Sequence, residues 1–112
     1  LKLASEKGLE TVGRMVQRLT SEPAEFFGLD VGTLDIGAQA DIAMINPETL
    51  ARYDCDPNRK LIYRELFEHE QLVNRSDGVV TRVLINGTVA WEQGDFTPAL
   101  GSQTLGRALR AA

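Results

Sequence analysis

The residues best suited to chemistry in this sequence are a single histidine and its two acidic neighbours, Glu68-His69-Glu70. A hydrolytic metal centre built on imidazole needs several histidines, because imidazole is the usual nitrogen ligand of zinc. The chain has one, and adjacent residues of a strand point to opposite faces, so at most two of the three groups share a side. We therefore expect His69 to be an exposed or hydrogen-bonded histidine rather than a metal ligand.

Cys55 is the other reactive side chain, and it stands between Asp54 and Asp56. Flanking carboxylates disfavour the thiolate, which is the nucleophilic form of cysteine. We expect a solvated loop at this place rather than a nucleophile or a weak metal site. A lone cysteine forms no intramolecular disulfide, which favours a reducing, cytoplasmic location.

The remaining polar residues suggest no site either. Asp35 and Asp41, like Glu68 and Glu70, give no sign of sharing a pocket, so a charged surface is expected. The sequence contains neither a glycine-rich phosphate loop nor a Gly-x-Ser-x-Gly nucleophile elbow. Two arginines near the end are expected in a solvated tail: Arg107 and Arg110. The residues alone predict no catalytic, cofactor-binding or metal-ligating group in this chain.

Composition indicates a folded chain and excludes some partners. Of 112 residues, 43% are hydrophobic and 25% are charged, close to the globular average. The net charge of −4 disfavours nucleic acid and anionic membrane surfaces as partners. No apolar run approaches the roughly 20 residues of a membrane span. The chain begins with Leu1 and enters a helical pattern almost at once, so we expect a segment of a longer protein.

Two helices are predicted near the start. Leu9, Val12, Val16 and Leu19 recur at helical spacing, which predicts an amphipathic helix over residues 8–19. A second helix should follow, with Pro23 at its first position, Ser21 or Glu22 as its cap and Gly28 ending it in a left-handed conformation. Three apolar residues near its end are expected to pack inward: Phe26, Phe27 and Leu29.

The rest of the chain reads as β-rich. Residues 41–45 are an apolar run bounded by Asn46-Pro47, which predicts a buried strand. Residues 46–60 read as a loop with at most one turn of helix, and residues 61–73 as irregular or extended. Residues 79–92 predict a hairpin, because Asn86-Gly87 between two β-branched runs is typical of a type I′ turn. The fold class is therefore α+β and β-rich.

Several short motifs resemble the C-terminal region of metal-dependent amidohydrolases. They are Thr20-Ser21-Glu22-Pro23-Ala24, a Gly-x-Leu-x-x-Gly segment from Gly32, Ala-Asp before a hydrophobic strand, and a closing strand that ends in Ile85-Asn86-Gly87. The ordered set is more specific than any one piece. The motif positions are Thr20, Pro23, Ala24, Gly28, Gly32, Gly37, Ala40, Asp41, Asn86 and Gly87.

Within that superfamily the chain looks closest to N-acyl-D-amino-acid deacylases, also called D-aminoacylases. The Thr20-Ser21-x-Pro23-Ala24 motif and a tail with Gly101, Gly106 and Leu109-Arg110 carry this resemblance. Residues 53–78 depart from the family pattern, because they are longer and more charged.

The resemblance implies a parent enzyme with a (β/α)₈ barrel and a small β-sandwich. Residues 1–30 would be a helical segment at the end of the barrel. Residues 31–112 would form part of the sandwich, with a long loop at 46–78 and a hairpin at 79–92. A divalent metal, expected to be zinc, would activate water in the parent, and its ligands would precede Leu1. This chain alone would be inactive, its motif positions structural, and Asp41 hydrogen-bonded to local backbone.

Two other functions remain open. The parent could hydrolyse a cyclic amide, as hydantoinases and dihydropyrimidinases do, or the chain could be a free-standing β-rich binding or oligomerisation module. The expected partners are the barrel and N-terminal strands of the parent and, for the parent, a small N-acyl amino acid. Without those missing strands we expect the isolated chain to self-associate.

Overall fold

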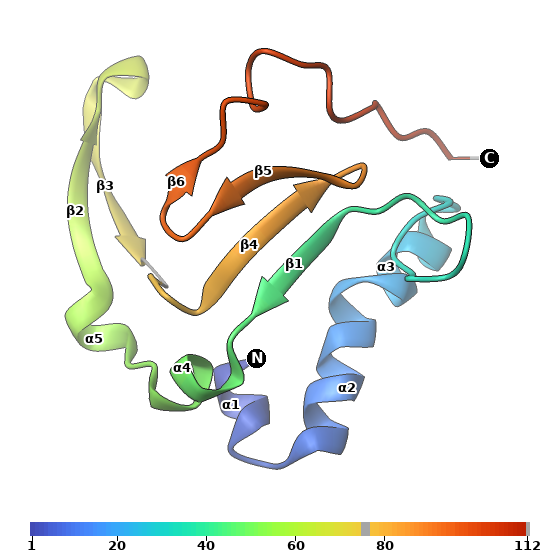
Figure 1. Cartoon of the computed structure of the whole chain (residues 1–112). Coiled ribbons are helices and arrows are strands. Elements are labelled where there is room, and N and C mark those ends of the chain that lie inside the picture. Colours follow the sequence, from blue (N-terminus) through green and yellow to red (C-terminus); the bar gives the residue numbers. More distant parts are fainter. Residues whose placement is uncertain (75–76, 112) are drawn as a thin grey trace.

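The computed structural model describes residues 1–74 and 77–111 and shows an α+β chain, as predicted (Figure 1). Three helices come first: α1 (Lys2–Ser5), α2 (Leu9–Leu19) and α3 (Ser21–Phe26). They lie beside a central sheet, and a separate two-stranded hairpin lies on the other side of that sheet (Figure 1).

The central sheet contains the closing hairpin that the sequence predicts. Its strand order is β1 (Ile42–Ile45), β4 (Val80–Ile85), β5 (Thr88–Glu92) and β6 (Asp95–Phe96), and every neighbouring pair is antiparallel. Asn86 and Gly87 form the β4–β5 turn with φ of 49° and 79°. Both values are positive, as a type I′ turn requires, so this prediction is confirmed.

The first helical prediction is confirmed, and the second is corrected in detail. Helix α2 covers the expected residues. Helix α3 begins at Ser21, so Pro23 is its third residue and neither Ser21 nor Glu22 precedes it as a cap. Gly28 has a φ of 64°, and the N–H of the following residue, Leu29, donates to the Ala24 carbonyl, which ends the helix as expected.

The segment at 46–78 is not one long loop as predicted, although its positions 75 and 76 lie outside the described residues. It contains α4 (Pro47–Arg52), α5 (Cys55–Asn58) and a hairpin of β2 (Arg59–Arg64) and β3 (His69–Asn74), joined through the 3₁₀ turn η1 (Glu65–Phe67). The extended structure expected at 61–73 is present over most of that stretch. Asn46 caps α4 by accepting from the N–H groups of Glu48 and Thr49 at 2.9 and 3.2 Å. The proline of α4 is its first residue, a position where the missing N–H costs nothing.

The described part of the chain has a small core, and two burial predictions are wrong. The buried hydrophobic residues are Ala4, Ala24, Leu50, Val79 and Ala90. Phe26 and Phe27 point outward with 83% and 61% of their surfaces exposed. Strand β1 forms where predicted but is not buried: it is an edge strand, and its Met44 and Ile45 side chains are exposed.

Candidate functional site

The motif positions Ala40 and Asp41 dock directly onto the turn formed by Asn86 and Gly87. Asp41 Oδ1 accepts a hydrogen bond from the Asn86 N–H at 2.7 Å, and the Ala40 carbonyl accepts one from the Gly87 N–H at 2.8 Å. Asp41 therefore does bond to backbone, as expected, but to backbone that is local in space and not in sequence. The entry to β1 is thereby fastened to the β4–β5 turn, and we call this contact the turn junction.

Two residues that the sequence did not single out as a pair support the turn junction. Gln39 donates through its amide nitrogen to Asp41, and its amide oxygen accepts from the Arg107 Nε–H. Gly106 lies against the same strand end, since a Cβ placed on it would be 3.7 Å from Ile85. The arginine expected in a solvated tail thus ties the tail to the junction, and no local pattern could have signalled a contact across 68 residues.

A second group of motif positions meets where the chain leaves α3. Gly32 has a φ of 89°, and a Cβ at this position would lie 2.9 Å from both the carbon and the oxygen of the Thr20 carbonyl and 3.2 Å from the Ala24 side chain. Only glycine permits this close approach in this conformation. The loop therefore packs against the junction of α2 and α3, while the Thr20 hydroxyl bonds back to the Val16 carbonyl at 2.8 Å.

Gly37 lies beside the turn junction and lines a hollow together with Gln39, Asn86 and Arg107. It has a φ of 92° and open space around it, so a turn alone explains its glycine. Three motif positions, Thr20, Gly32 and Asp41, also line one pocket, and Gly37 and Asn86 line another. Among the described residues, neither pocket contains a group of three or more His, Cys, Asp and Glu side chains that could hold a metal ion.

His69 is exposed and hydrogen-bonded, as predicted. Its Nδ1 lies 2.8 Å from the Phe67 carbonyl oxygen and its Nε2 lies 3.4 Å from the Gln71 amide nitrogen. It is the first residue of β3 and pairs with Arg64 across the hairpin. Both ring nitrogens therefore have partners close to the hairpin tip.

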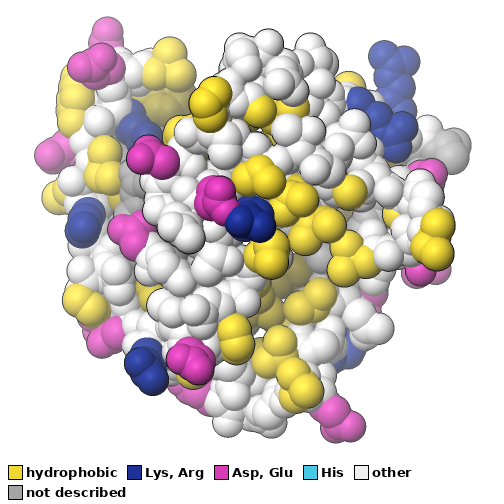
Figure 2. Space-filling model, viewed as in Figure 1, with side chains coloured by type: hydrophobic (Ala, Val, Ile, Leu, Met, Phe, Trp, Pro, Cys, Tyr) yellow, Lys and Arg dark blue, Asp and Glu magenta, His cyan; other side chains and the backbone are white. Residues whose placement is uncertain are grey.

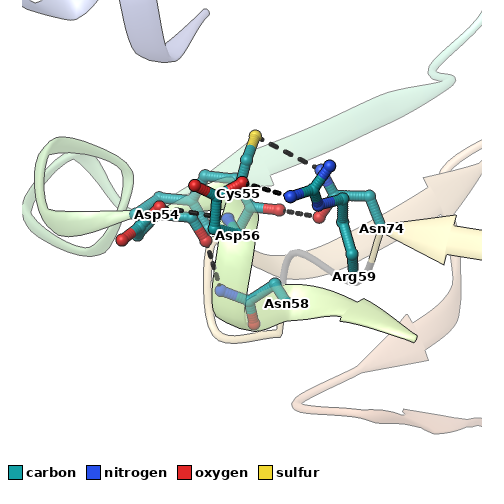
Figure 3. A network of polar contacts seen from close by, with 7 residues as sticks. Asp54, Cys55, Asp56, Asn58, Arg59 and Asn74 are labelled. Carbon is teal, nitrogen blue, oxygen red and sulfur yellow. Dashed lines mark hydrogen bonds and ion pairs between the residues drawn. The ribbon is translucent and has the colours of Figure 1, made fainter.

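Cys55 belongs to a polar network at the base of the β2–β3 hairpin, and not to a loop (Figure 3). Its Sγ accepts a hydrogen bond from the Asn74 amide nitrogen at 3.3 Å, and Asn74 in turn accepts from the Tyr53 hydroxyl. Asp54 caps α5 by accepting from the Asp56 N–H at 3.1 Å. Burial raises the pKa of the Tyr53 phenol, and the charge and hydrogen bond of Cys55 raise that pKa further.

This network fits a structural role better than a chemical one. Arg59 Nη2 contacts Asp56 Oδ1 at 2.6 Å, and the Asn58 amide donates to the Asp54 carbonyl at 2.6 Å, so the hairpin base is cross-linked to α5 (Figure 3). Within residues 1–74 and 77–111, no group of three or more His, Cys, Asp and Glu side chains could hold a metal ion. The described residues therefore offer no fit for the divalent metal that the resemblance implies.

An apolar groove runs between α2 and β1. Its walls include Val16 and Leu19 of the helix, Leu34 of the following loop, and Ile42 and Ile45 of the strand. Figure 2 shows hydrophobic side chains gathered near the middle of this face, over β1 and towards α2. No residue of α2 is buried, and 61% of the Leu19 surface is exposed. We call this surface the α2–β1 groove.

Comparison with known proteins decides the family. A sequence model of the amidohydrolase family matches residues 1–90, which include both groups of motif contacts. The chain belongs to the amidohydrolase family. The hydrolase class predicted from the motifs is thereby supported, while the deacylase subfamily is not distinguished by this match.

Relatives of this amidohydrolase segment are much longer proteins. An uncharacterized protein of Mycobacterium tuberculosis is 36% identical over 90 residues, which are 77% of this chain and 14% of that protein. Dihydroorotases of Enterococcus faecalis and Geobacillus thermodenitrificans are 31% and 33% identical, over 79% and 80% of this chain and 20% of each enzyme. The amidohydrolase segment thus spans about a fifth or less of these relatives.

No solved structure matches the segment. Among its described residues, no helix has the length and apolar character needed to cross a membrane.

Proposed function

We propose that this chain is the C-terminal, non-catalytic segment of a metal-dependent amidohydrolase that cleaves an amide bond of a small molecule. The family match over residues 1–90 carries the proposal. The structure adds support, because the motif positions near Asp41, Asn86 and Gly32 make backbone contacts that organise the fold. The metal, zinc by expectation, would lower the pKa of a bound water for attack on the amide carbonyl. Residues outside this chain would hold it.

The first substrate candidate is an N-acyl-D-amino acid. The Thr20-Ser21-Glu22-Pro23-Ala24 motif and the glycines of the tail favour it, because they resemble the deacylase branch of the family. In this reaction water would add to the acyl carbonyl, and the C–N bond would break to release a carboxylate and a free D-amino acid.

The second substrate candidate is a cyclic amide. Relatives named dihydroorotase, at 31–36% identity, favour it. Ring opening of a cyclic amide uses the same attack of water on a carbonyl carbon, but the amine leaving group stays attached to the product. The two candidates therefore differ in the substrate pocket and not in the type of bond that breaks.

Hydrolysis assays on the full-length protein test the proposal. N-acetyl-D-amino acids, their L enantiomers, dihydroorotate and hydantoin would be offered in parallel, with and without a chelator. Chelator-sensitive release of free D-amino acid supports the deacylase, and chelator-sensitive ring opening supports the cyclic-amide hydrolase. Absence of hydrolysis of every amide by metal-replete protein would contradict the whole proposal and favour a binding or oligomerisation module.

The proposal also names a partner for the α2–β1 groove. We expect the preceding part of the full-length enzyme to cover its exposed residues, among them Leu19 and Ile45. Removing that cover exposes an apolar surface and a sheet edge, both of which promote association. The isolated chain should therefore self-associate, which light scattering would measure. A monodisperse monomer at micromolar concentration would contradict this expectation.

A further inference from the structure

The β2–β3 hairpin stands apart from the rest of the molecule (Figure 1). Its strands pair in continuous antiparallel register from Arg59 with Asn74 to Arg64 with His69, and they form a sheet of their own. An isolated two-stranded hairpin is at best marginally stable in water and needs a third strand or a packing surface. Something must cover this hairpin for it to keep a fixed shape.

One face of the hairpin has an apolar centre. Leu61 lies directly opposite Leu72, and each has 64% of its surface exposed. Directly opposed residues lie on the same face, and so do residues two positions along a strand. Arg59 and Tyr63 therefore flank Leu61 on this face, and Glu70 lies opposite Tyr63. We call this surface the leucine face.

The leucine face has opposite charges at its two ends. Arg59 lies two residues from the leucine pair towards the base, and Glu70 lies two residues from it towards the tip. Both side chains belong to exposed residues. Glu65 and Glu68 add negative charge around the tip, where Figure 2 shows acidic side chains at the upper left. On the leucine face itself, Arg59 therefore marks the base end and Glu70 the tip end, while off this face Asp56 pairs with Arg59 at the base and Arg64 lies at the tip.

The charge pattern of one leucine face is complementary to that of a second copy rotated by 180°. When two leucine faces are stacked with their strands antiparallel, the leucine pairs meet at the two-fold axis. Arg59 of each copy then lies over Tyr63 and beside Glu70 of the other, where an ion pair and a cation–π contact are both within reach. Parallel stacking would instead oppose the arginines to each other and the glutamates to each other. The charge pattern therefore selects the antiparallel arrangement.

We propose that the leucine face binds the leucine face of a second copy of this protein, so that two hairpins form an isologous dimer contact. The contact would join the hairpins of two full-length molecules. It differs from association through the α2–β1 groove, which the preceding part of the full-length protein would cover under the proposed function. The ion pair between Arg59 and Asp56 is exposed on both sides, so its rearrangement costs little.

A charge-exchange experiment on the full-length protein tests this contact. Arg59→Glu and Glu70→Arg each place like charges at both ends of the interface, so each variant alone should dimerise about tenfold more weakly, by sedimentation equilibrium. In a mixed dimer the introduced glutamate of one copy faces the introduced arginine of the other, and the unchanged Arg59 and Glu70 face each other at the second end. The heterodimer should therefore regain the affinity of the original protein. Native mass spectrometry of isotope-labelled variants would detect that heterodimer.

A second pair of variants tests the apolar centre. Leu72→Glu should weaken dimerisation by at least about tenfold, because it places charges at the two-fold axis. Gln71→Glu is the matched control: it adds the same charge one residue away on the opposite face, and it should change the dissociation constant by less than about twofold. Circular dichroism would verify that each variant is folded.

The proposal is overturned by any of three results. The full-length protein could be monomeric at all concentrations tested. It could form a dimer that neither Leu72→Glu nor the charge variants weaken, which would place the contact on another face. Finally, the mixture of Arg59→Glu and Glu70→Arg could stay as weak as its components, which would attribute their effect to local destabilisation and not to pairing between copies.

Discussion

The Asp41 carboxylate and the Asn86 backbone N–H meet at 2.7 Å across a separation of 45 residues. This bond joins the two halves of the motif set that identified the family, since Ala40 and Gly87 form a backbone bond beside it. A carboxylate that accepts from a backbone N–H makes one of the stronger hydrogen bonds in proteins. Four of the recognisable residues of this chain thus meet in one backbone contact between the entry to β1 and the β4–β5 turn.

Replacement of Asp41 should therefore weaken the fold. We expect Asp41→Ala to lower the free energy of unfolding by about 1–2 kcal/mol, because the Asn86 N–H loses its charged acceptor. Urea unfolding followed by circular dichroism would measure the change. Asp35→Ala removes an exposed aspartate from the same loop and should cost less than about 0.5 kcal/mol. Equal losses for both variants would contradict the importance of this contact.

Two glycines should respond to alanine with opposite signs. Gly32→Ala should destabilise the chain by about 2–3 kcal/mol, since its Cβ would meet the Thr20 carbonyl at 2.9 Å and its φ is positive. Gly13 lies inside α2 with nothing within 4 Å of a Cβ, so Gly13→Ala should stabilise the chain by about 0.5–1 kcal/mol. Thermal unfolding of both variants would test the pair, and stabilisation by Gly32→Ala would refute the packing argument.

A charged residue in the α2–β1 groove should destabilise the full-length protein more than the isolated chain. Leu19→Asp should change the unfolding free energy of the isolated chain by less than about 0.5 kcal/mol, because Leu19 is mostly exposed there. In the full-length protein the same change should cost about 2 kcal/mol or more, because a charge would enter a covered apolar contact. Gln17→Asp, at an exposed position of the same helix, should be mild in both. Equal effects of Leu19→Asp in both proteins would argue against a cover.

The raised pKa of Tyr53 predicts that the stability of the folded chain depends on pH at the hairpin base. Its pKa is raised above the ordinary 10.0, first by burial and then by Cys55. The folded chain therefore holds the phenol proton more tightly than the unfolded chain. This stabilisation is present below the unfolded pKa of 10.0 and is lost as pH rises through the folded pKa.

Ultraviolet titration of tyrosinate would measure that pKa. The titration would use a Tyr63→Phe background, since the chain has two tyrosines. Cys55→Ser should lower the pKa of Tyr53, because it removes the side chain whose charge and hydrogen bond raise that pKa. An unchanged or higher pKa in that variant would contradict the assigned cause.

Local signals in the sequence predicted part of this fold and misjudged another part. The Asn86-Gly87 turn and α2 depend on neighbouring residues, so pattern alone located them. Residues 46–60 were predicted to be a loop with at most one turn of helix, from their prolines, acids and asparagines. The same residue types cap helices, and here Asn46 and Asp54 begin α4 and α5. Short capped helices and loops share a composition, which is why pattern did not separate them.

Burial was harder to predict than secondary structure. Phe26, Phe27 and Met44 are apolar and lie in or beside predicted elements, yet they are exposed. Whether these side chains are buried depends on which residues pack against α3 and β1. A periodic pattern within one segment does not identify those packing residues. The contacts of Gln39 with Asp41 and Arg107 were likewise invisible, because one of them spans 68 residues and has no local signature.

The joint between Asp41 and Asn86 also bears on how the chain between them can vary. That chain must close into a loop, but closure entropy grows only with the logarithm of length, and a doubling costs about 0.6 kcal/mol. Part of the connection folds onto itself as the β2–β3 hairpin, which brings its own ends together. Insertions and deletions in this hairpin should therefore leave the joint nearly unaffected. The hairpin can therefore change length without forcing a change in the contact between Asp41 and Asn86.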